Sequence, residues 1–384
     1  MPLKIEEYPK LKDFVIRHQE ETLLLLKELA AIGAPTFQED QRAIFCLEWL
    51  KRQGAENAYI DEAGNVIFPF RCSSGRPIAA FLAHMDVVFP EKGQIPVKEE
   101  GRYLKAPGIG DDTANMVNLL MCVKYLLMDP PKDTKYGLLF AANTCEEGLG
   151  NLKGSKTIFQ QHPDIAEMIS FDLYLGDLFQ TAVGSHRYRI EVRTCGGHSF
   201  HDFGRENAIQ VLSGIVQELY GQPLPKTGTT TYNVGRFEGG TSVNTIPQSA
   251  SMYYEFRSDQ KDSLQTMEQQ LYEILESHRS SEVEIDTTLL GIRPCGSEDL
   301  PQDKMKDLIR RQNRLIQHYT GQPAHIQSGS TDANIPLSLG IPAVTLGTVA
   351  GGGAHTYEEW IEKKSMITGQ QLALATILQY CETI

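Results

Sequence analysis

The chain has 384 residues, a net charge of −13 and seven scattered cysteines without a Cys-x-x-Cys pair. An acidic surface repels phosphate, which argues against nucleic-acid binding, and no apolar run reaches the length of a membrane span. The length exceeds one ordinary core and favours two domains. Scattered cysteines, odd in number, and a start without an apolar signal segment lead us to expect a cytoplasmic protein with reduced thiols.

The N-terminal part is predicted to be helical. Apolar residues at helical spacing predict a helix over residues 11–31, which Gly33 and Pro35 end. Thr36 and Glu39 then form a capping-box pattern that predicts the start of a second helix, running to Arg52.

Four short apolar runs follow, separated by longer segments. They occupy residues 78–83, 138–142, 168–171 and 341–346. Continuously apolar runs of this length are typical of strands buried on both faces of a parallel sheet. A predicted helix over 113–127 lies between the first two. This alternation predicts an α/β fold with a mainly parallel sheet.

The middle of the chain has a different pattern. Residues 186–194 alternate strictly between apolar and charged side chains, which predicts a half-exposed antiparallel strand. The elements expected after it are a helix at 206–220, strands at 230–237 and 249–256, a helix at 263–277 and a strand at 283–289. The order β-α-β-β-α-β predicts a ferredoxin-like domain at 184–296, inserted into a larger domain of residues 1–183 and 297–384.

Residues suited to metal binding stand at or just beyond the ends of the predicted strands. They are His84 with Asp86, Asp111 with Asp112, Glu146 with Glu147, Asp172 and His355. The carboxyl ends of strands in an open α/β sheet meet at one edge, so we expect these side chains to converge. Adjacent carboxylates after a buried strand are unfavourable without a cation or hydrogen-bond donors nearby.

These residue types indicate a catalytic site with two metal ions. Imidazole and carboxylate ligands without thiolate suit zinc or a similar first-row metal. Paired ions can share a bridging carboxylate and act together on one substrate. Asp86 is placed to orient His84 by accepting its other ring N–H. Of Glu146 and Glu147, one can bind metal while the other serves as general base.

The chain resembles the dizinc peptidases and amidohydrolases that include peptidase T, aminoacylase, glutamate carboxypeptidase and succinyl-diaminopimelate desuccinylase. The resemblance spans the whole chain, inserted domain included. Its motifs are Ala83-His-Met-Asp86, Gly110-Asp-Asp112, Cys145-Glu-Glu-Gly148, Ser170-Phe-Asp172, Gly196-Gly-His-Ser199, Asn244-Thr-Ile-Pro247, Ser330-Thr-Asp-Ala-Asn334 and Gly353-Ala-His355.

The resemblance implies a role for each residue of the site. Two Zn²⁺ ions per chain are expected, with Co²⁺ or Mn²⁺ as alternatives. The implied ligands are Asp111 as the bridge, with a cis peptide to Asp112, His84 and Asp172 on one ion, and Glu147 and His355 on the other.

The catalytic and substrate contacts are implied in the same way. Glu146 would deprotonate the attacking water and later protonate the leaving amine, with Asp86 beside it in the catalytic set. His198, on the inserted domain, would stabilise the oxyanion; in dimeric members of the family this histidine comes from the partner subunit. The implied substrate-binding residues are Asn244, Arg257 and Asp332.

Two departures from the family pattern affect these expectations. Thr113-Ala114-Asn115 follows the aspartate pair where the family often has Lys or Gly, which would alter a wall of the pocket. Asp172 is followed by Leu173 rather than glycine, and Asp177 is a rival ligand ranked second. In the family, an Asp at this ligand position goes with aminopeptidases and dipeptidases, whereas a Glu goes more with deacylases and carboxypeptidases.

The leading prediction is therefore a cytoplasmic, homodimeric dizinc exopeptidase that hydrolyses short peptides, with the inserted domain acting as lid and dimerisation domain. The alternative is an N-acyl-amino-acid deacylase or carboxypeptidase that uses the same dizinc site. A non-catalytic binding module is a third hypothesis, and Glu146 argues against it because a binder does not need a general base. Neither a nucleic-acid nor a membrane partner is expected.

Overall fold

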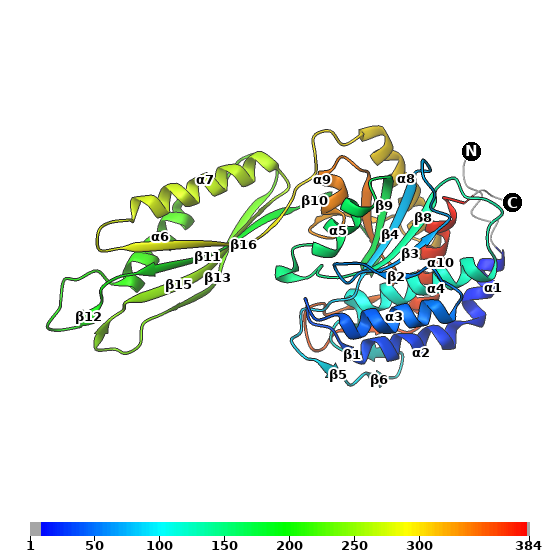
Figure 1. The fold of residues 1–384 in the computed structure, drawn as a ribbon, viewed down its shortest axis with the longest axis horizontal. Coiled ribbons are helices and arrows are strands. Elements are labelled where there is room, and N and C mark those ends of the chain that lie inside the picture. The colour runs from blue at the N-terminus through cyan, green and yellow to red at the C-terminus, as the bar shows by residue number, and fades with distance from the viewer. Residues whose placement is uncertain (1–8, 382–384) are drawn as a thin grey trace. The chain divides into compact units, whose positions relative to one another are not determined.

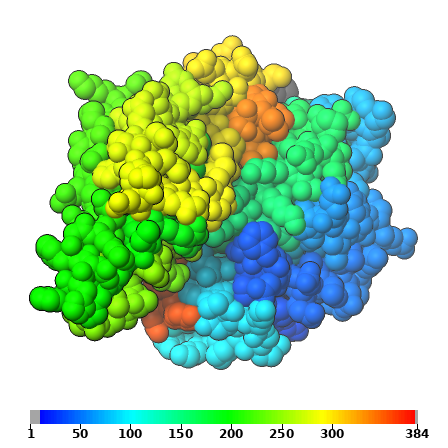
Figure 2. Space-filling model, turned by 60° about the vertical axis from the view of Figure 1, so that its left-hand side comes forward, coloured from blue at the N-terminus to red at the C-terminus, as the bar shows by residue number. Residues whose placement is uncertain are grey.

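The computed structural model describes residues 9–381, which form two compact units. The larger unit contains the described residues up to Ala182 and those from Ser297 on, and the smaller unit is Val183–Gly296. Each unit has its own hydrophobic core. The smaller unit is coloured green to yellow in Figure 2. No helix within residues 9–381 is long and apolar enough to cross a membrane.

The larger unit is built on an eight-stranded mixed sheet (Figure 1). The order across it is β17 (His325–Gly329), β10 (Asp177–Ala182), β18 (Ala343–Gly347), β9 (Ile165–Leu175), β4 (Ile78–His84), β8 (Gly137–Asn143), β3 (Val66–Phe70) and β2 (Tyr59–Ile60). The central strands β18, β9, β4 and β8 are mutually parallel. β10 and β17 are parallel to each other, whereas β10–β18, β3–β8 and β2–β3 are antiparallel.

The four central strands are the four that the apolar runs predicted. Every residue of β4, β8 and β18 is buried, which explains why these strands are apolar without alternation. Phe81 of β4 stacks between Phe140 of β8 and Phe171 of β9 at centroid distances of 5.5 and 6.4 Å. This rigid centre carries the candidate site at its carboxyl edge.

Helices cover both faces of the sheet (Figure 1). They are α1 (Pro9–Arg17), α2 (Gln19–Ala30), α3 (Asp40–Arg52), α4 (Asn115–Met128), α5 (Lys153–Gln161), α8 (Gln302–Thr320), α9 (Asn334–Ser338) and α10 (Ser365–Leu378). α4 links β4 to β8, and α5 links β8 to β9 on the other side of β4. Because such crossovers are right-handed, α4 and α5 lie on opposite faces. The connection that leaves β4 therefore runs toward one edge of the sheet, and the next connection runs back past β4 toward the other edge. The direction of connection reverses beside β4.

Two small sheets extend the larger unit. One pairs β1 (Ile32–Gly33) with β5 (Gly93–Gln94). The other has the order β19 (Gly351–Gly352), β20 (Trp360–Glu362), β7 (Tyr103–Lys105) and β6 (Lys98–Glu100). Because β20 pairs with β7, the loop between β19 and β20 is joined to the segment that leads into Asp111.

Two predictions for the N-terminal part were wrong in detail. The helix expected over 11–31 is interrupted at His18, whose ring Nδ1 lies 2.9 Å from the carbonyl oxygen of Phe14. The helix α3 has no side-chain cap, and its N-cap residue is Glu39 rather than Thr36. The side chains of Thr36 and Glu39 instead bind partners near residues 86 and 145, because tertiary contacts override the local capping pattern.

The smaller unit has the predicted β-α-β-β-α-β order. Its antiparallel sheet runs β13 (Thr230–Gly239), β15 (Ser249–Ser258), β11 (Gly184–Arg193) and β16 (Glu284–Arg293), and its helices are α6 (Ala208–Gly221) and α7 (Lys261–Ser277). A separate two-stranded ribbon pairs β12 (Gly197–His198) with β14 (Thr245–Ile246).

Candidate metal centre

The candidate ligands converge at the carboxyl edge of the central strands. His84 is the last residue of β4, Glu146 and Glu147 follow β8, Asp172 lies near the end of β9, and His355 follows β18. The site stands beside β4, where the direction of connection reverses, and such switch points are the usual binding crevices of open α/β sheets.

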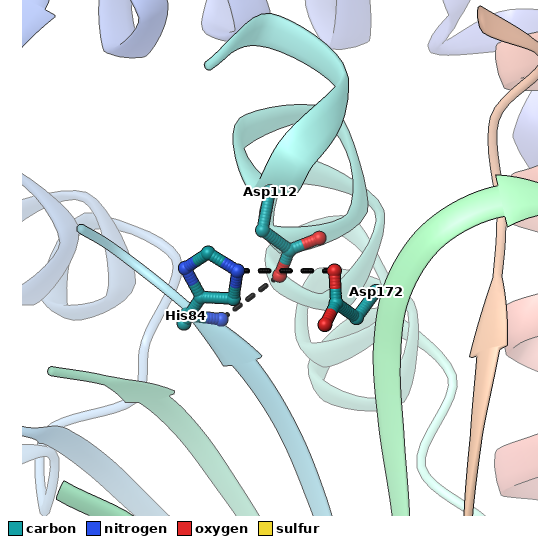
Figure 3. Close-up of side chains that lie close together, drawn as sticks. All are labelled: His84, Asp112 and Asp172. Carbon is teal, nitrogen blue, oxygen red and sulfur yellow. Dashed lines mark hydrogen bonds and ion pairs between the residues drawn. The ribbon is translucent and has the colours of Figure 1, made fainter. Parts of the chain in front are cut away.

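His84 is fully buried and is held at three points. Its backbone N–H donates to Asp112 Oδ2 at 2.8 Å, and its ring Nδ1 lies 3.0 Å from the backbone carbonyl of Asp86. Its ring Nε2 points toward Asp111 Oδ1 at 3.1 Å and Asp172 Oδ1 at 3.8 Å. Figure 3 shows the side chains of Asp112 and Asp172 turned toward His84. One ring nitrogen is thus anchored while the other faces the carboxylates.

Asp111 and Asp112 lie in a kinked turn, Ile109–Ala114, that leads into α4, and Asp111 itself has a non-helical backbone conformation. The peptide bond between them is cis, as the resemblance implied. The buried carboxylate of Glu359 accepts hydrogen bonds from three backbone N–H groups of this segment, at 2.7 Å from Gly108, 2.9 Å from Gly110 and 2.7 Å from Asp111. Glu359 therefore fixes the backbone that presents Asp111.

Asp86 organises the loop that carries the glutamate pair. Its carboxylate accepts the backbone N–H groups of Glu146 at 3.0 Å and Glu147 at 2.9 Å, and the hydroxyl of Thr36 donates to it at 2.8 Å. The backbone N–H of Cys145 donates to Glu39 at 2.9 Å. Asp86 Oδ1 is 3.5 Å from His84 Nδ1, so the shorter orienting contact comes from the main chain of Asp86.

His355 lies on the other side of Asp111 from His84. Its ring Nε2 is 3.2 Å from Asp111 Oδ2 and 3.1 Å from Glu147 Oε1. Asp111 thus directs one carboxylate oxygen to each histidine, which is the geometry that a bridging carboxylate requires.

The residues present fit metal ions. Ligand atoms within 4.8 Å of one another form three groups: His84 with Asp112 and Asp172, His84 with Glu146 and Glu147, and Asp111 with Glu147 and His355. Asp172 Oδ1 is buried without a hydrogen-bond partner in the described part of the chain. An orphaned carboxylate oxygen that faces an imidazole nitrogen is expected where a cation binds between them.

The shifted pKa values of the site residues also indicate that nearby positive charge would stabilise the site. Burial raises the pKa of Asp112, and burial together with the charge of Asp111 raises the pKa of Asp172. Hydrogen bonds to Asp111 and Glu147 raise the pKa of His355 to about 10. In the absence of metal, a proton on His355 therefore offsets part of the negative charge of Asp111 and Glu147.

The rival ligand Asp177 has a different set of partners. It lies at the start of β10, where its Oδ1 is 3.1 Å from His325 Nδ1 and 2.6 Å from Gln327 Nε2 on β17. Asp172, by contrast, lies 3.8 Å from His84 Nε2. The geometry therefore favours Asp172 over Asp177 as the ligand.

Asp332, the third predicted substrate-binding residue, is buried in the larger unit. It is 1% exposed and accepts a hydrogen bond from Asn143, the last residue of β8, at 2.7 Å. Burial raises its pKa to about 7, and the charge of His84 and the hydrogen bond from Asn143 act in the opposite direction. Its observed contact is with the end of the strand that precedes the glutamate pair, and its role in substrate binding stays a prediction.

The structure places three predicted residues on the smaller unit. His198 is exposed on the β12–β14 ribbon, where its backbone pairs with that of Thr245 and the N–H of Ser199 donates to the carbonyl of Asn244 at 3.1 Å. His198 and Asn244 are thus neighbours in space. Arg257 lies on β15, and its guanidinium binds both carboxylate oxygens of Glu255 at 3.0 and 3.3 Å.

Sequence reasoning missed the residues that support the ligands. No sequence pattern placed four of them in the site: Glu359, Thr36, Glu39 and Arg42. Arg42 is fully buried on α3 and donates to the carbonyl of Met85 at 2.8 Å and to the hydroxyl of Thr113 at 3.1 Å. The Glu359 contact joins positions 251 residues apart, so no local pattern could reveal it.

An α/β unit with imidazole and carboxylate groups gathered at the carboxyl ends of its parallel strands defines a metal-dependent peptidase or amidohydrolase. Residues 80–379 match the family model described as Peptidase family M20/M25/M40. Because this match covers more than half of the chain, the protein belongs to the peptidase family M20/M25/M40.

Individual relatives are distant in sequence. The chain is 24% identical over 329 residues to the uncharacterised protein YqjE of Bacillus subtilis (strain 168), covering 82% of this chain and 84% of that protein. It is 23% identical over 320 residues to the succinyl-diaminopimelate desuccinylase of Marinobacter nauticus, covering 78% and 82%. The structure of aminopeptidase PepT from Bacillus cereus ATCC 10987 aligns with a TM-score of 0.72 at 20% identity, covering 94% of this chain and 98% of that chain.

Removal of bound metal is expected to destabilise the larger unit, because the buried carboxylates then repel one another. Ligand at about 100 times its Kd stabilises a folded protein by about 2.7 kcal/mol. The chain has two tryptophans, Trp49 and Trp360, and both lie in the larger unit, so thermal unfolding followed by tryptophan fluorescence reports on that unit. EDTA-treated protein should unfold at a lower temperature than the same sample resupplied with Zn²⁺, while K⁺ at equal ionic strength should have no such effect. Identical curves with and without Zn²⁺ would contradict the metal centre.

Proposed function

We propose that this protein is a two-zinc exopeptidase that hydrolyses short peptides. The observation that carries the proposal is the position of Asp111 between His84 and His355, with one carboxylate oxygen directed to each. In the proposed assignment, Asp111 would be shared by two Zn²⁺ ions, His84 and Asp172 would hold one of them, and Glu147 and His355 would hold the other. When bound, the two ions would supply Lewis-acid activation of a water molecule and of the scissile carbonyl.

Glu146 is the proposed general base. Its carboxylate is buried and can approach the same space as His84 and Glu147. The two carboxylate oxygens of Asp86 each accept one backbone N–H, from Glu146 and from Glu147. These hydrogen bonds hold the loop that carries both glutamates in place. Glu146 would take a proton from the attacking water and pass it to the leaving amine.

His198 is the proposed oxyanion donor. Its Nδ1 lies 3.2 Å from the backbone N–H of Phe200 and 3.4 Å from that of His201, so Nδ1 is an acceptor. A neutral imidazole that accepts at Nδ1 carries its proton on Nε2. Nε2–H is therefore free to donate to developing negative charge on a substrate oxygen.

The remaining parts of the proposal concern the substrate and the assembly. Asn244, next to His198, and Arg257 are proposed to bind the substrate backbone or carboxylate; Arg257 would have to exchange its contact with Glu255 for that role. We further propose a cytoplasmic homodimer in which the smaller unit forms the dimer contact and His198 serves the partner's site.

A deacylase or carboxypeptidase activity is the second candidate. It would use the same metal site, and the desuccinylase of Marinobacter nauticus supports it, since that relative is named for removal of an acyl group. Aminopeptidase PepT, with its similar fold, and the aspartate at position 172 favour the peptidase. The peptidase activity and the deacylase or carboxypeptidase activity differ only in the groups that flank the scissile amide.

A mixed substrate panel decides between them. Purified protein loaded with Zn²⁺ or Co²⁺ is incubated with dipeptides, tripeptides, N-blocked peptides and N-acyl amino acids, and metal is measured on the same sample. We expect cleavage of peptides with a free amino end at about two metals per chain. Turnover of N-acyl amino acids alone would replace the peptidase with the deacylase. Absence of both bound metal and turnover would overturn the proposed function.

A further inference from the structure

Asn115 lies at the first turn of α4 and is fully buried among the segments that present three of the candidate metal ligands. It belongs to Thr113-Ala114-Asn115, the stretch in which this chain departs from the pattern of its family. Its amide makes four hydrogen bonds, and none of them closes a regular turn of α4.

The amide nitrogen of Asn115 joins two ligand loops. It donates to the carbonyl of Gly110, the residue before Asp111, at 3.2 Å, and to the carbonyl of Leu173, the residue after Asp172, at 2.9 Å. Two carbonyl oxygens that face each other repel, and a shared NH₂ group converts this repulsion into two hydrogen bonds.

The amide oxygen of Asn115 joins a third segment. It accepts the backbone N–H of Thr348 at 2.7 Å and the Thr348 hydroxyl at 2.6 Å. Thr348 directly follows β18 and begins the segment that leads to His355. With two carbonyls on one side and two donors on the other, only one orientation of the amide satisfies every partner.

The Leu173 contact supports an unfavourable backbone conformation. Leu173 has φ of +63°, which is rare for a residue with a side chain. It lies in a bulge of β9, because Phe171 pairs with Leu346 whereas Leu175 pairs with Gly347. A Cβ at position 347 would lie 2.1 Å from the backbone of Tyr174, so Gly347 leaves room for this bulge. Asp172 lies at this bulge, and its carboxylate faces His84 (Figure 3).

We propose that Asn115 is a positioning residue that sets the spacing between the Asp111 turn, the Asp172 bulge and the segment that carries His355. The proposal rests on the metal centre of the proposed function. Groups that orient metal ligands typically change metal affinity or activity by about 10–100-fold when they are replaced. The amide of Asn115 contacts the main chain beside Asp111 and Asp172, and it also acts on the buried carboxylate of Asp112.

The test compares two truncations on the same helix. Asn115→Ala removes all four hydrogen bonds, whereas Asn118→Ala, also fully buried, removes bonds to the carbonyl and hydroxyl of Thr348 at 3.1 and 2.9 Å. Asn118 has no hydrogen bond to Gly110 or Leu173 within residues 9–381, so it controls for the loss of buried hydrogen bonds in α4. Asn115→Ser serves in the same comparison if Asn115→Ala does not fold.

The readouts are Co²⁺ affinity by titration, the visible spectrum of the Co²⁺ protein, and unfolding by urea. We expect Asn115→Ala to weaken Co²⁺ binding by about 10–100-fold and to change the spectrum. Asn118→Ala should lower stability without either effect. Equal Co²⁺ affinity and equal spectra in the two variants would overturn the positioning role while leaving the metal centre intact. Failure of the wild-type protein to bind Co²⁺ would overturn the metal centre and, with it, this inference.

Discussion

Replacing Glu146 with glutamine is expected to lower kcat by about 10²–10⁴-fold while metal content stays at the wild-type level. Glutamine keeps the shape of the side chain but cannot accept a proton at neutral pH. The backbone N–H of residue 146 would still donate to Asp86, so the loop should keep its position. The measurement is steady-state kinetics on the preferred peptide, together with metal analysis of the same protein.

The matched control is the neighbouring residue. Glu147 lies 3.1 Å from His355 Nε2 and is the proposed ligand, so Glu147→Gln should lower metal content and activity together. Glu48→Gln, on the exposed side of α3, should change neither. Loss of metal from Glu146→Gln with full retention in Glu147→Gln would reverse the two roles. Wild-type turnover by Glu146→Gln would remove Glu146 from proton transfer.

Replacing Glu359 with alanine is expected to be the most destabilising single change near the site. It would leave the backbone N–H groups of Gly108, Gly110 and Asp111 without their acceptor in a buried region. A buried donor without a partner costs about 1–3 kcal/mol, and three are affected at once. Burial and the charge of Asp111 raise the pKa of Glu359 to about 8, whereas the three donors act in the opposite direction.

Glu359→Gln should have a smaller effect than Glu359→Ala. Glutamine retains one acceptor oxygen, but its NH₂ group must face at least one backbone N–H. The adjacent exposed residue supplies the control, since Glu358→Ala should leave the urea midpoint unchanged. Unfolding is followed by tryptophan fluorescence in metal-free protein, and metal affinity is measured separately. Equal midpoints for Glu359→Ala and Glu358→Ala would show that the three hydrogen bonds do not hold the Asp111 turn.

The central strands and the metal-binding residue types follow from local sequence. Strands buried on both faces must be apolar without alternation, so residues 78–83 and 138–142 were recognisable as β4 and β8. The carboxyl ends of parallel strands meet at one edge, which brings His84 and Asp172 together although they are 88 positions apart in the sequence. The strands β2, β3, β10 and β17 were not predicted. β3 is an apolar run that contains Pro69, a residue that argues against a strand, whereas β2, β10 and β17 have no continuous apolar run of comparable length.

The supporting contacts were decided by the tertiary structure alone. The pattern of Thr36 and Glu39 matches a capping box, yet both side chains bind the segments around Asp86 and Cys145. Nothing adjacent in sequence shows that Asn115 or Glu359 acts on the Asp111 turn.

The sequence by itself therefore determined the fold class and the chemical type of the ligands, because both depend on residue identity and spacing along single strands. Which carboxylate faces which histidine, and which buried polar groups hold them there, depended on contacts between segments as far apart as positions 108 and 359. Such contacts arise only when the sheet assembles and buried backbone groups take the polar partners that lie nearest.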